Sequence, residues 1–77
     1  MRLFELFLLG MQSGYGVSVK IIDINDNEVM YHCVSEFQWV YKWVIEKNLA
    51  KAEVVYFGFN RLPHGEVVFD ITARIDR

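Results

Sequence analysis

The side chains best suited to nucleophilic or metal chemistry in this chain are His32, Cys33 and His64. His32 and Cys33 are adjacent, so on a strand their side chains point to opposite faces, and His64 stands far along the chain. A zinc site needs three or four ligands at characteristic spacing, and an active site needs a nucleophile, a base and an orienting group in one pocket. The sequence therefore predicts no metal site, no cofactor and no catalytic residue, and we expect a protein that is not an enzyme.

The segment DINDNEVMYHCV, residues 23–34, begins like a calcium-binding loop, with Asp23, Asn25 and Asn27 at alternate positions. Such a loop needs a glycine at its sixth position and a bidentate glutamate at its twelfth. Glu28 and Val34 stand at these two positions instead. Because Asn and Asp also tolerate left-handed backbone and form local hydrogen bonds, the segment predicts a hairpin turn rather than a calcium site.

The segment EFQWVYKWVIEK, residues 36–47, predicts an amphipathic helix that is apolar around most of its circumference. At about 100° per residue, one face is expected to pack on a sheet: Phe37, Val40, Tyr41 and Val44. Trp39 and Trp43 are four residues apart, which makes them neighbours on a different face of the helix. The helix therefore presents more apolar surface than one packing face requires.

The two tryptophans leave three interpretations open. Either both indoles are further core, or they form an exposed patch that a partner buries, or they are exposed by chance and have no role. In the second case the candidate protein-binding residues are Trp39, Trp43, Gln38, Lys42 and Glu46. Burial of two tryptophans could contribute up to about 10 kcal/mol, which is of the order of the cost of association. The partner would be another protein or a second copy of this chain.

The segment VYFGFNRL, residues 55–62, resembles the aromatic strand motif of RNA-recognition domains at Phe57, Gly58 and Phe59. It departs from that motif at Val55, Tyr56, Asn60 and Leu62. The resemblance implies an alternative function, single-stranded nucleic-acid binding on a sheet face, in which aromatic rings stack on bases. The residues that would serve it are Phe57, Phe59, Lys20, Arg61 and Arg74. The other interpretation places both phenylalanines in the core.

The composition sets the class of protein. A chain of 77 residues that is 53% hydrophobic predicts one folded domain, residues 1–77. A net charge of −2 gives no general attraction to nucleic acid or to anionic membranes. The single cysteine cannot form an intramolecular disulfide and suits a reducing, cytoplasmic location. Glu5 interrupts the apolar start of the chain, which is too short to span a membrane.

The helices and strands that hold these segments in place can also be predicted from the sequence. The apolar start predicts a strand at Leu3–Leu9, and Ser35, with Gln38 three residues later, predicts the beginning of the helix. Further strands are predicted at residues 17–24, 28–34, 53–60 and 67–75, the last from alternation of apolar and polar residues that only Val68 interrupts. The predicted fold class is α+β: a mostly antiparallel five-stranded sheet (β-β-β-α-β-β) with one helix packed on one face.

A small acidic α+β domain with no catalytic set and no cofactor motif resembles many phage-encoded proteins that bind and inhibit host machinery, anti-CRISPR proteins among them. The resemblance is one of size, charge and fold class, and it implies a viral inhibitor. We therefore expect a small non-enzymatic protein-binding module, regulatory or inhibitory, that acts by stoichiometric contact.

Overall fold

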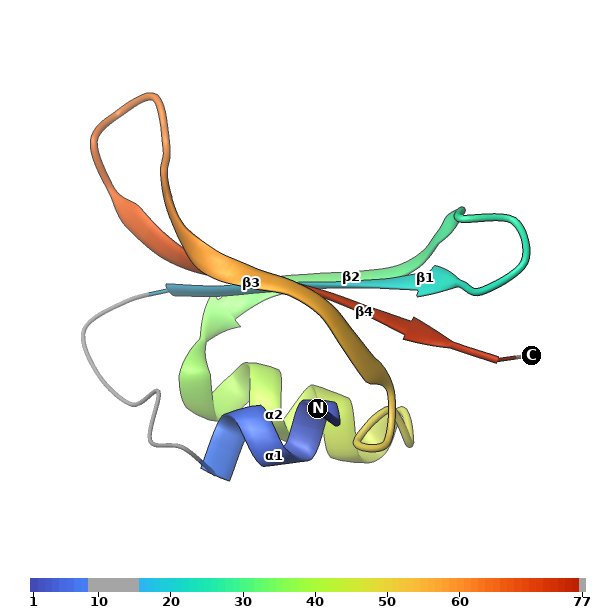
Figure 1. Ribbon diagram of the computed structural model, residues 1–77. Coiled ribbons are helices and arrows are strands. Elements are labelled where there is room, and N and C mark those ends of the chain that lie inside the picture. The colour runs from blue at the N-terminus through green and yellow to red at the C-terminus, as the bar shows by residue number, and fades with distance from the viewer. Residues whose placement is uncertain (9–15, 77) are drawn as a thin grey trace.

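The computed structural model describes residues 1–8 and 16–76. It shows an α+β fold with a four-stranded mixed sheet and two short helices (Figure 1). The elements follow one another as α1 (Leu3–Leu8), β1 (Gly16–Asp23), β2 (Val29–Glu36), α2 (Phe37–Glu46), β3 (Glu53–Arg61) and β4 (Val67–Ile75).

The strand order across the sheet is β2-β1-β4-β3. β1 pairs with β2, and β3 with β4, in antiparallel fashion, whereas the central strands β1 and β4 are parallel. The prediction of a mostly antiparallel sheet is therefore right for the two hairpins and wrong for the centre. Parallel neighbours need a long connection, and here it consists of β2, α2 and β3.

The predicted strand at the start of the chain is wrong, because residues 3–8 form the helix α1. Leu3, Leu6 and Phe7 are buried, which is the i, i+3, i+4 spacing of one helix face. The Arg2 backbone N–H donates to Glu5 Oε1 at 2.8 Å, which is half of a capping box. The described part of the sheet thus has four strands rather than five, and there are two helices where one was expected. Leu9 lies outside the described residues.

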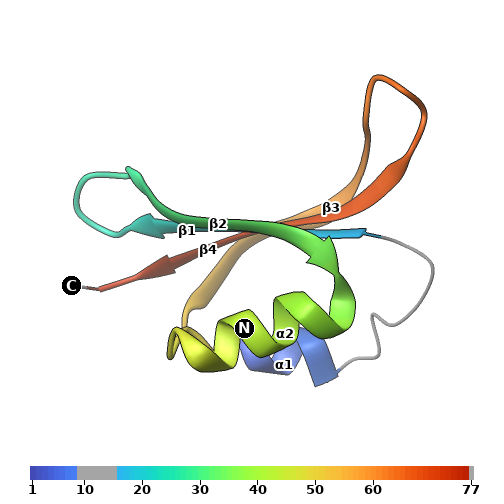
Figure 2. The ribbon, with the colours of Figure 1, turned by 180° about the vertical axis from the view of Figure 1, so that it is seen from behind.

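Both helices lie on the same face of the sheet (Figures 1 and 2). The core fills the space between them and the strands: Leu3, Leu6, Phe7, Val17, Val19, Ile21, Val40, Val44, Leu49, Ala52, Phe69, Ile71 and Ala73. The alternation predicted for the last strand is confirmed, since Phe69, Ile71 and Ala73 are all buried. The opposite face of the sheet carries no helix among the described elements.

The β1–β2 hairpin closes through Asp23. Its Oδ1 accepts hydrogen bonds from the backbone N–H groups of Asn25 at 2.6 Å and Asp26 at 3.3 Å. Asn27 has φ 55°, which asparagine tolerates better than most residues. The predicted turn chemistry is confirmed at Asp23, whose carboxylate binds the local backbone, and at Asn27, whose backbone is left-handed.

α2 ends in a Schellman motif. The Asn48 N–H donates to Ile45 C=O at 3.1 Å and the Leu49 N–H donates to Val44 C=O at 2.9 Å. Asn48 has φ 58°, and Leu49 and Val44 are both buried, as this motif favours. At the other end the prediction was wrong: Ser35 belongs to β2, and Glu36 is the N-cap with no side-chain hydrogen bond.

Candidate protein-binding surface

Trp43 belongs largely to the core. It is partly buried and packs against the core cluster, with its ring centroid 6.4 Å from that of Tyr31 on β2, at 74° between the planes. Lys47 Nζ lies 5.9 Å from the centroid of the same Tyr31 ring. For Trp43, the interpretation as core therefore describes the structure better.

Trp39, one helical turn earlier, is 55% exposed. Lys42 Nζ lies 5.9 Å from the centroid of its ring and 3.9 Å from Glu46 Oε1. Gln38, Lys42 and Glu46 are all exposed. The structure thus brings Lys42 against the one exposed tryptophan and Glu46 against Lys42, whereas Gln38 is exposed and, among the described residues, forms no hydrogen bond with either.

The strand β2 runs beside α2, and its Tyr31 contacts Trp43. It forms one edge of the sheet, and Figure 2 shows it along the near edge with α2 beneath it. Among the described residues its ladder partner is β1 only. Val29 and Val34 are 58% and 56% exposed, and the strand contains neither proline nor lysine, two residues that commonly protect edges. We call Trp39, Trp43 and β2 together the open side.

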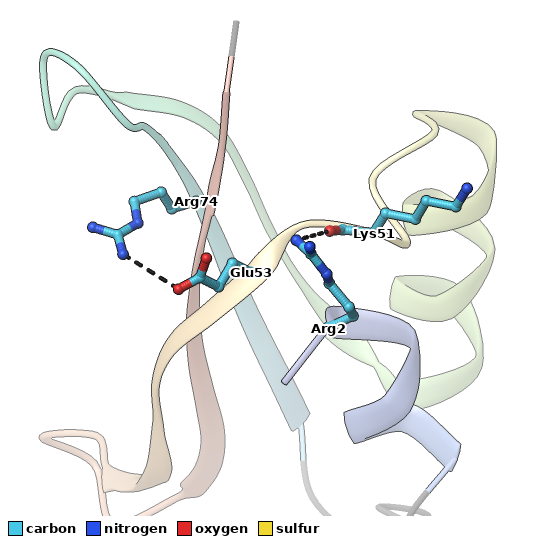
Figure 3. Close-up of polar contacts among 4 residues, drawn as sticks. All are labelled: Arg2, Lys51, Glu53 and Arg74. Atoms are coloured by element: carbon cyan, nitrogen blue, oxygen red, sulfur yellow. Dashed lines mark hydrogen bonds and ion pairs between the residues drawn. The ribbon is translucent and has the colours of Figure 1, made fainter.

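At the opposite edge of the sheet, the N-terminal residues cover the start of β3. The Val54 N–H at the start of β3 donates to Met1 C=O at 2.8 Å, and the Leu3 N–H donates to Ala52 C=O at 2.8 Å. Arg2 Nη1 donates to Lys51 C=O at 3.1 Å (Figure 3). We call Met1–Leu8 and the residues 50–54 that they contact the closed side.

The five residues proposed for nucleic-acid binding divide between the two faces of the sheet. Cross-strand partners share a face, and Phe57 and Phe59 stand opposite Ile71 and Phe69, on the helix-bearing face. Their rings lie 6.2 and 5.1 Å from that of Phe69, although they remain 51% and 62% exposed.

The cationic residues of that set do not gather around these rings. Arg61 stands opposite Val67, on the same face as the two phenylalanines. Lys20 is opposite Thr72, on the face without helices. Arg74 is on that face too, with Nη2 3.4 Å from Glu53 Oε1 (Figure 3). The structure therefore places one of the three cations with the aromatic pair.

One polar pair was missed by sequence reasoning. Ser18 Oγ lies 3.1 Å from His32 Nε2, on neighbouring strands whose register the sequence did not reveal. Ser18 is buried, and Asp70 stands opposite it on β4 rather than beside His32. Among the described residues no third group holds the imidazole, so the pair satisfies a buried hydroxyl without forming a triad.

Cys33 pairs with Val19 on the helix-bearing face, opposite to the face of His32. Burial raises the pKa of its thiol, which lowers the fraction of nucleophilic thiolate at neutral pH. Within residues 1–8 and 16–76, no three His, Cys, Asp or Glu side chains are grouped as metal ligands would be. None of the described helices is long and apolar enough to cross a membrane.

Comparison of the chain with protein-family models, with curated proteins and with solved structures finds no match in any of the three. The surface must therefore be interpreted from its own geometry.

Proposed function

We propose that this chain is a small non-enzymatic module that binds another protein in the cytoplasm, with Trp39 as the anchor of the contact surface. The observation that carries the proposal is the exposure of Trp39, at 55%, on the helix α2 that lies beneath the edge strand β2 (Figure 2). Tryptophan is enriched at the energetic centres of protein interfaces, and an indole that stands half in water leaves apolar surface that a partner can cover. Gln38, Lys42 and Glu46 are the polar rim that we propose for it.

The energy available from Trp39 is limited. Its exposed half amounts to about 130 Å², and burial of that area would contribute roughly 3 kcal/mol. This is about a third of the roughly 10 kcal/mol that burial of two fully exposed tryptophans could contribute. Since association costs about 4–15 kcal/mol, Trp39 must act together with further contacts, and the nearest source of them is the rest of the open side.

The mode of action that we propose is regulation or inhibition by stoichiometric contact, in which the bound module covers a site on its partner. The phage-type inhibitors, anti-CRISPR proteins among them, are the specific version of this proposal. It is tested by adding the purified chain to a CRISPR effector in a target-cleavage assay. Inhibition that is complete near one module per effector supports this version, and unchanged cleavage at tenfold excess rejects it.

The general proposal is tested by affinity capture with three forms of the full chain: wild type, Trp39→Ala and Ile45→Ala. Ile45 is a matched control, because it lies on the same helix and is 53% exposed, on the other flank of α2. We expect wild type and Ile45→Ala to retain one protein at one-to-one stoichiometry, and Trp39→Ala to retain at least tenfold less. Equal retention by Trp39→Ala and wild type would contradict the role of Trp39.

A further inference from the structure

The edge strand β2 combines three features that specify a kind of partner. Along its outer edge, no described strand pairs with it. It pairs regularly with β1 from Tyr31 to Glu36, and its register shifts between Tyr31 and Val29, so about three residues of the regular part direct both N–H and C=O away from the sheet. An extended chain that adds as a fifth strand satisfies all of these groups at once. The outward N–H and C=O groups of β2 therefore favour a partner segment in an extended conformation.

Carboxylates stand at both ends of this strand. Glu28 precedes it and Glu36 ends it, and both are exposed and form no ion pair with a described residue. Of the neighbouring lysines of α2, Lys42 is paired with Glu46, and Lys47 lies over the Tyr31 ring and keeps its positive charge. An added strand with Lys or Arg near each end would meet an opposite charge in either direction.

The side chains beside the edge are mainly apolar. On the helix-bearing face the added residues would lie beside Tyr31 and Cys33, with α2 below (Figure 2) and its Trp43 in contact with Tyr31. On the other face they would lie beside Val34, which is 56% exposed, and His32. Alternate positions of the added strand are therefore favoured to be apolar or β-branched.

From these features we infer that β2 receives an extended segment of a partner protein, free of proline, with alternating apolar residues and a basic residue near each end. This deepens the proposed function and rests on it, since the added strand would supply the contacts that Trp39 lacks. A second copy of the chain fits less well: pairing β2 with itself about His32 sets Glu28 opposite Glu36 at both ends, and like charges placed so are destabilising.

The experiment is residue-by-residue amide hydrogen exchange on the full chain, with synthetic peptides as the probes. The first peptide has nine residues and blocked ends: lysine at each end, with alternating valine and threonine between. The second replaces both lysines by glutamate, and the third is the first with proline at its centre. In the free protein we expect alternate amides of β2 to exchange fast. The lysine peptide at millimolar concentration should slow them at least about twofold, the value for half occupancy, and the other two should not.

Variants of the protein test the charge argument. Glu28→Lys with Glu36→Lys should reverse the preference, so that the glutamate peptide protects β2 and the lysine peptide does not. The matched control is Glu66→Lys with Asp76→Lys, which makes the same change in net charge at two exposed positions outside β2 and should keep the wild-type preference. A reversal in both double variants would show that net charge, and not the strand ends, selects the peptide, and would overturn the inference.

Other outcomes also overturn it: β2 amides that are uniformly protected in dilute protein, protection that rises with protein concentration without peptide, or no protection by any peptide. The outcome for the proposed function is separate. If Trp39→Ala loses its captured partner while no peptide protects β2, protein binding stands and strand addition fails. If the lysine peptide protects β2 while Trp39→Ala captures as wild type does, strand addition stands and the Trp39 anchor fails.

Discussion

The two edges of the sheet, on the open side and on the closed side, differ in how far the described part of the chain covers them. On the closed side, residues 1–8 add backbone hydrogen bonds to the segment before β3 and to its start at Val54, and the Phe7 ring lies 5.6 Å from that of Phe37. On the open side, Trp43 contacts Tyr31, but within residues 1–8 and 16–76 Trp39 stays 55% exposed and β2 pairs with β1 alone. The difference teaches that aromatic content alone does not mark an interface, because the same kinds of residue serve stability on one side and are exposed on the other.

The largest expected effect is a loss of folding stability after a substitution on the closed side. Leu3 is fully buried, so Leu3→Ala should destabilise the fold by about 2–5 kcal/mol, much of the roughly 4–11 kcal/mol expected for a chain of this size. Urea denaturation measures it. Leu8→Ala is the control within the same helix, since Leu8 is 72% exposed and should change stability by at most about 0.5 kcal/mol. Equal losses would mean that α1 does not pack as described.

The next effect separates the two tryptophans. Trp43→Ala should cost about 2 kcal/mol, less than a fully buried tryptophan, because it removes the contact with Tyr31. Trp39→Ala should cost less than about 1 kcal/mol, the value of an exposed cation–π contact with Lys42. Thermal unfolding of both variants checks this. A Trp39→Ala loss as large as that of Trp43→Ala would place both indoles in the core and remove the proposed anchor.

A smaller effect is expected where the N-terminal residues cover the start of β3. Arg2→Ala removes the hydrogen bond to Lys51 C=O and should cost about 0.5–1 kcal/mol, with faster amide exchange at Val54, whose N–H binds Met1 C=O. Arg61→Ala serves as the control, because Arg61 is exposed at the far end of β3. If Val54 exchanges equally fast in wild type and Arg2→Ala, the guanidinium does not hold the N-terminal segment in place.

The smallest effect is a dependence on pH. Burial raises the pKa of Cys33 above its usual value of 9.0, so the folded state binds the proton more tightly than the unfolded state. This contribution to stability is complete below pH 9 and is lost as the pH rises through the folded pKa. Melting temperatures at pH 7 and pH 10 should therefore differ more in wild type than in Cys33→Ala. An equal difference would mean that water reaches the thiol from the open side.

Much of the fold follows from local sequence pattern. The alternation from Val67 to Ile75 predicted β4 and its buried face, and the segment at residues 36–47 predicted α2. The start of the chain was misjudged because nearly every residue of LFELFL is apolar, which hides the buried spacing of Leu3, Leu6 and Phe7. The residue that could have indicated α1 is Glu5, three residues after Arg2. Its carboxylate accepts a hydrogen bond from the Arg2 backbone N–H at the start of the helix.

The arrangement of the sheet and of the candidate site could be predicted less well. The parallel pairing of β1 and β4 depends on contacts between residues about 50 positions apart, which no local pattern encodes. The spacing of Trp39 and Trp43 predicted that they share a side of α2. It could not predict that Tyr31 covers one of them, because that depends on how α2 lies beneath β2. The rim residues Gln38, Lys42 and Glu46 are exposed as predicted.

The most direct test of the open side is acrylamide quenching of two single-tryptophan variants in dilute solution. Trp43→Phe leaves Trp39 as the reporter, and Trp39→Phe leaves Trp43. The structure predicts red-shifted, readily quenched emission from Trp39 and blue-shifted, protected emission from Trp43. Emission from Trp39 as blue and as protected as that of Trp43, at a concentration where the chain is monomeric, would contradict an open side.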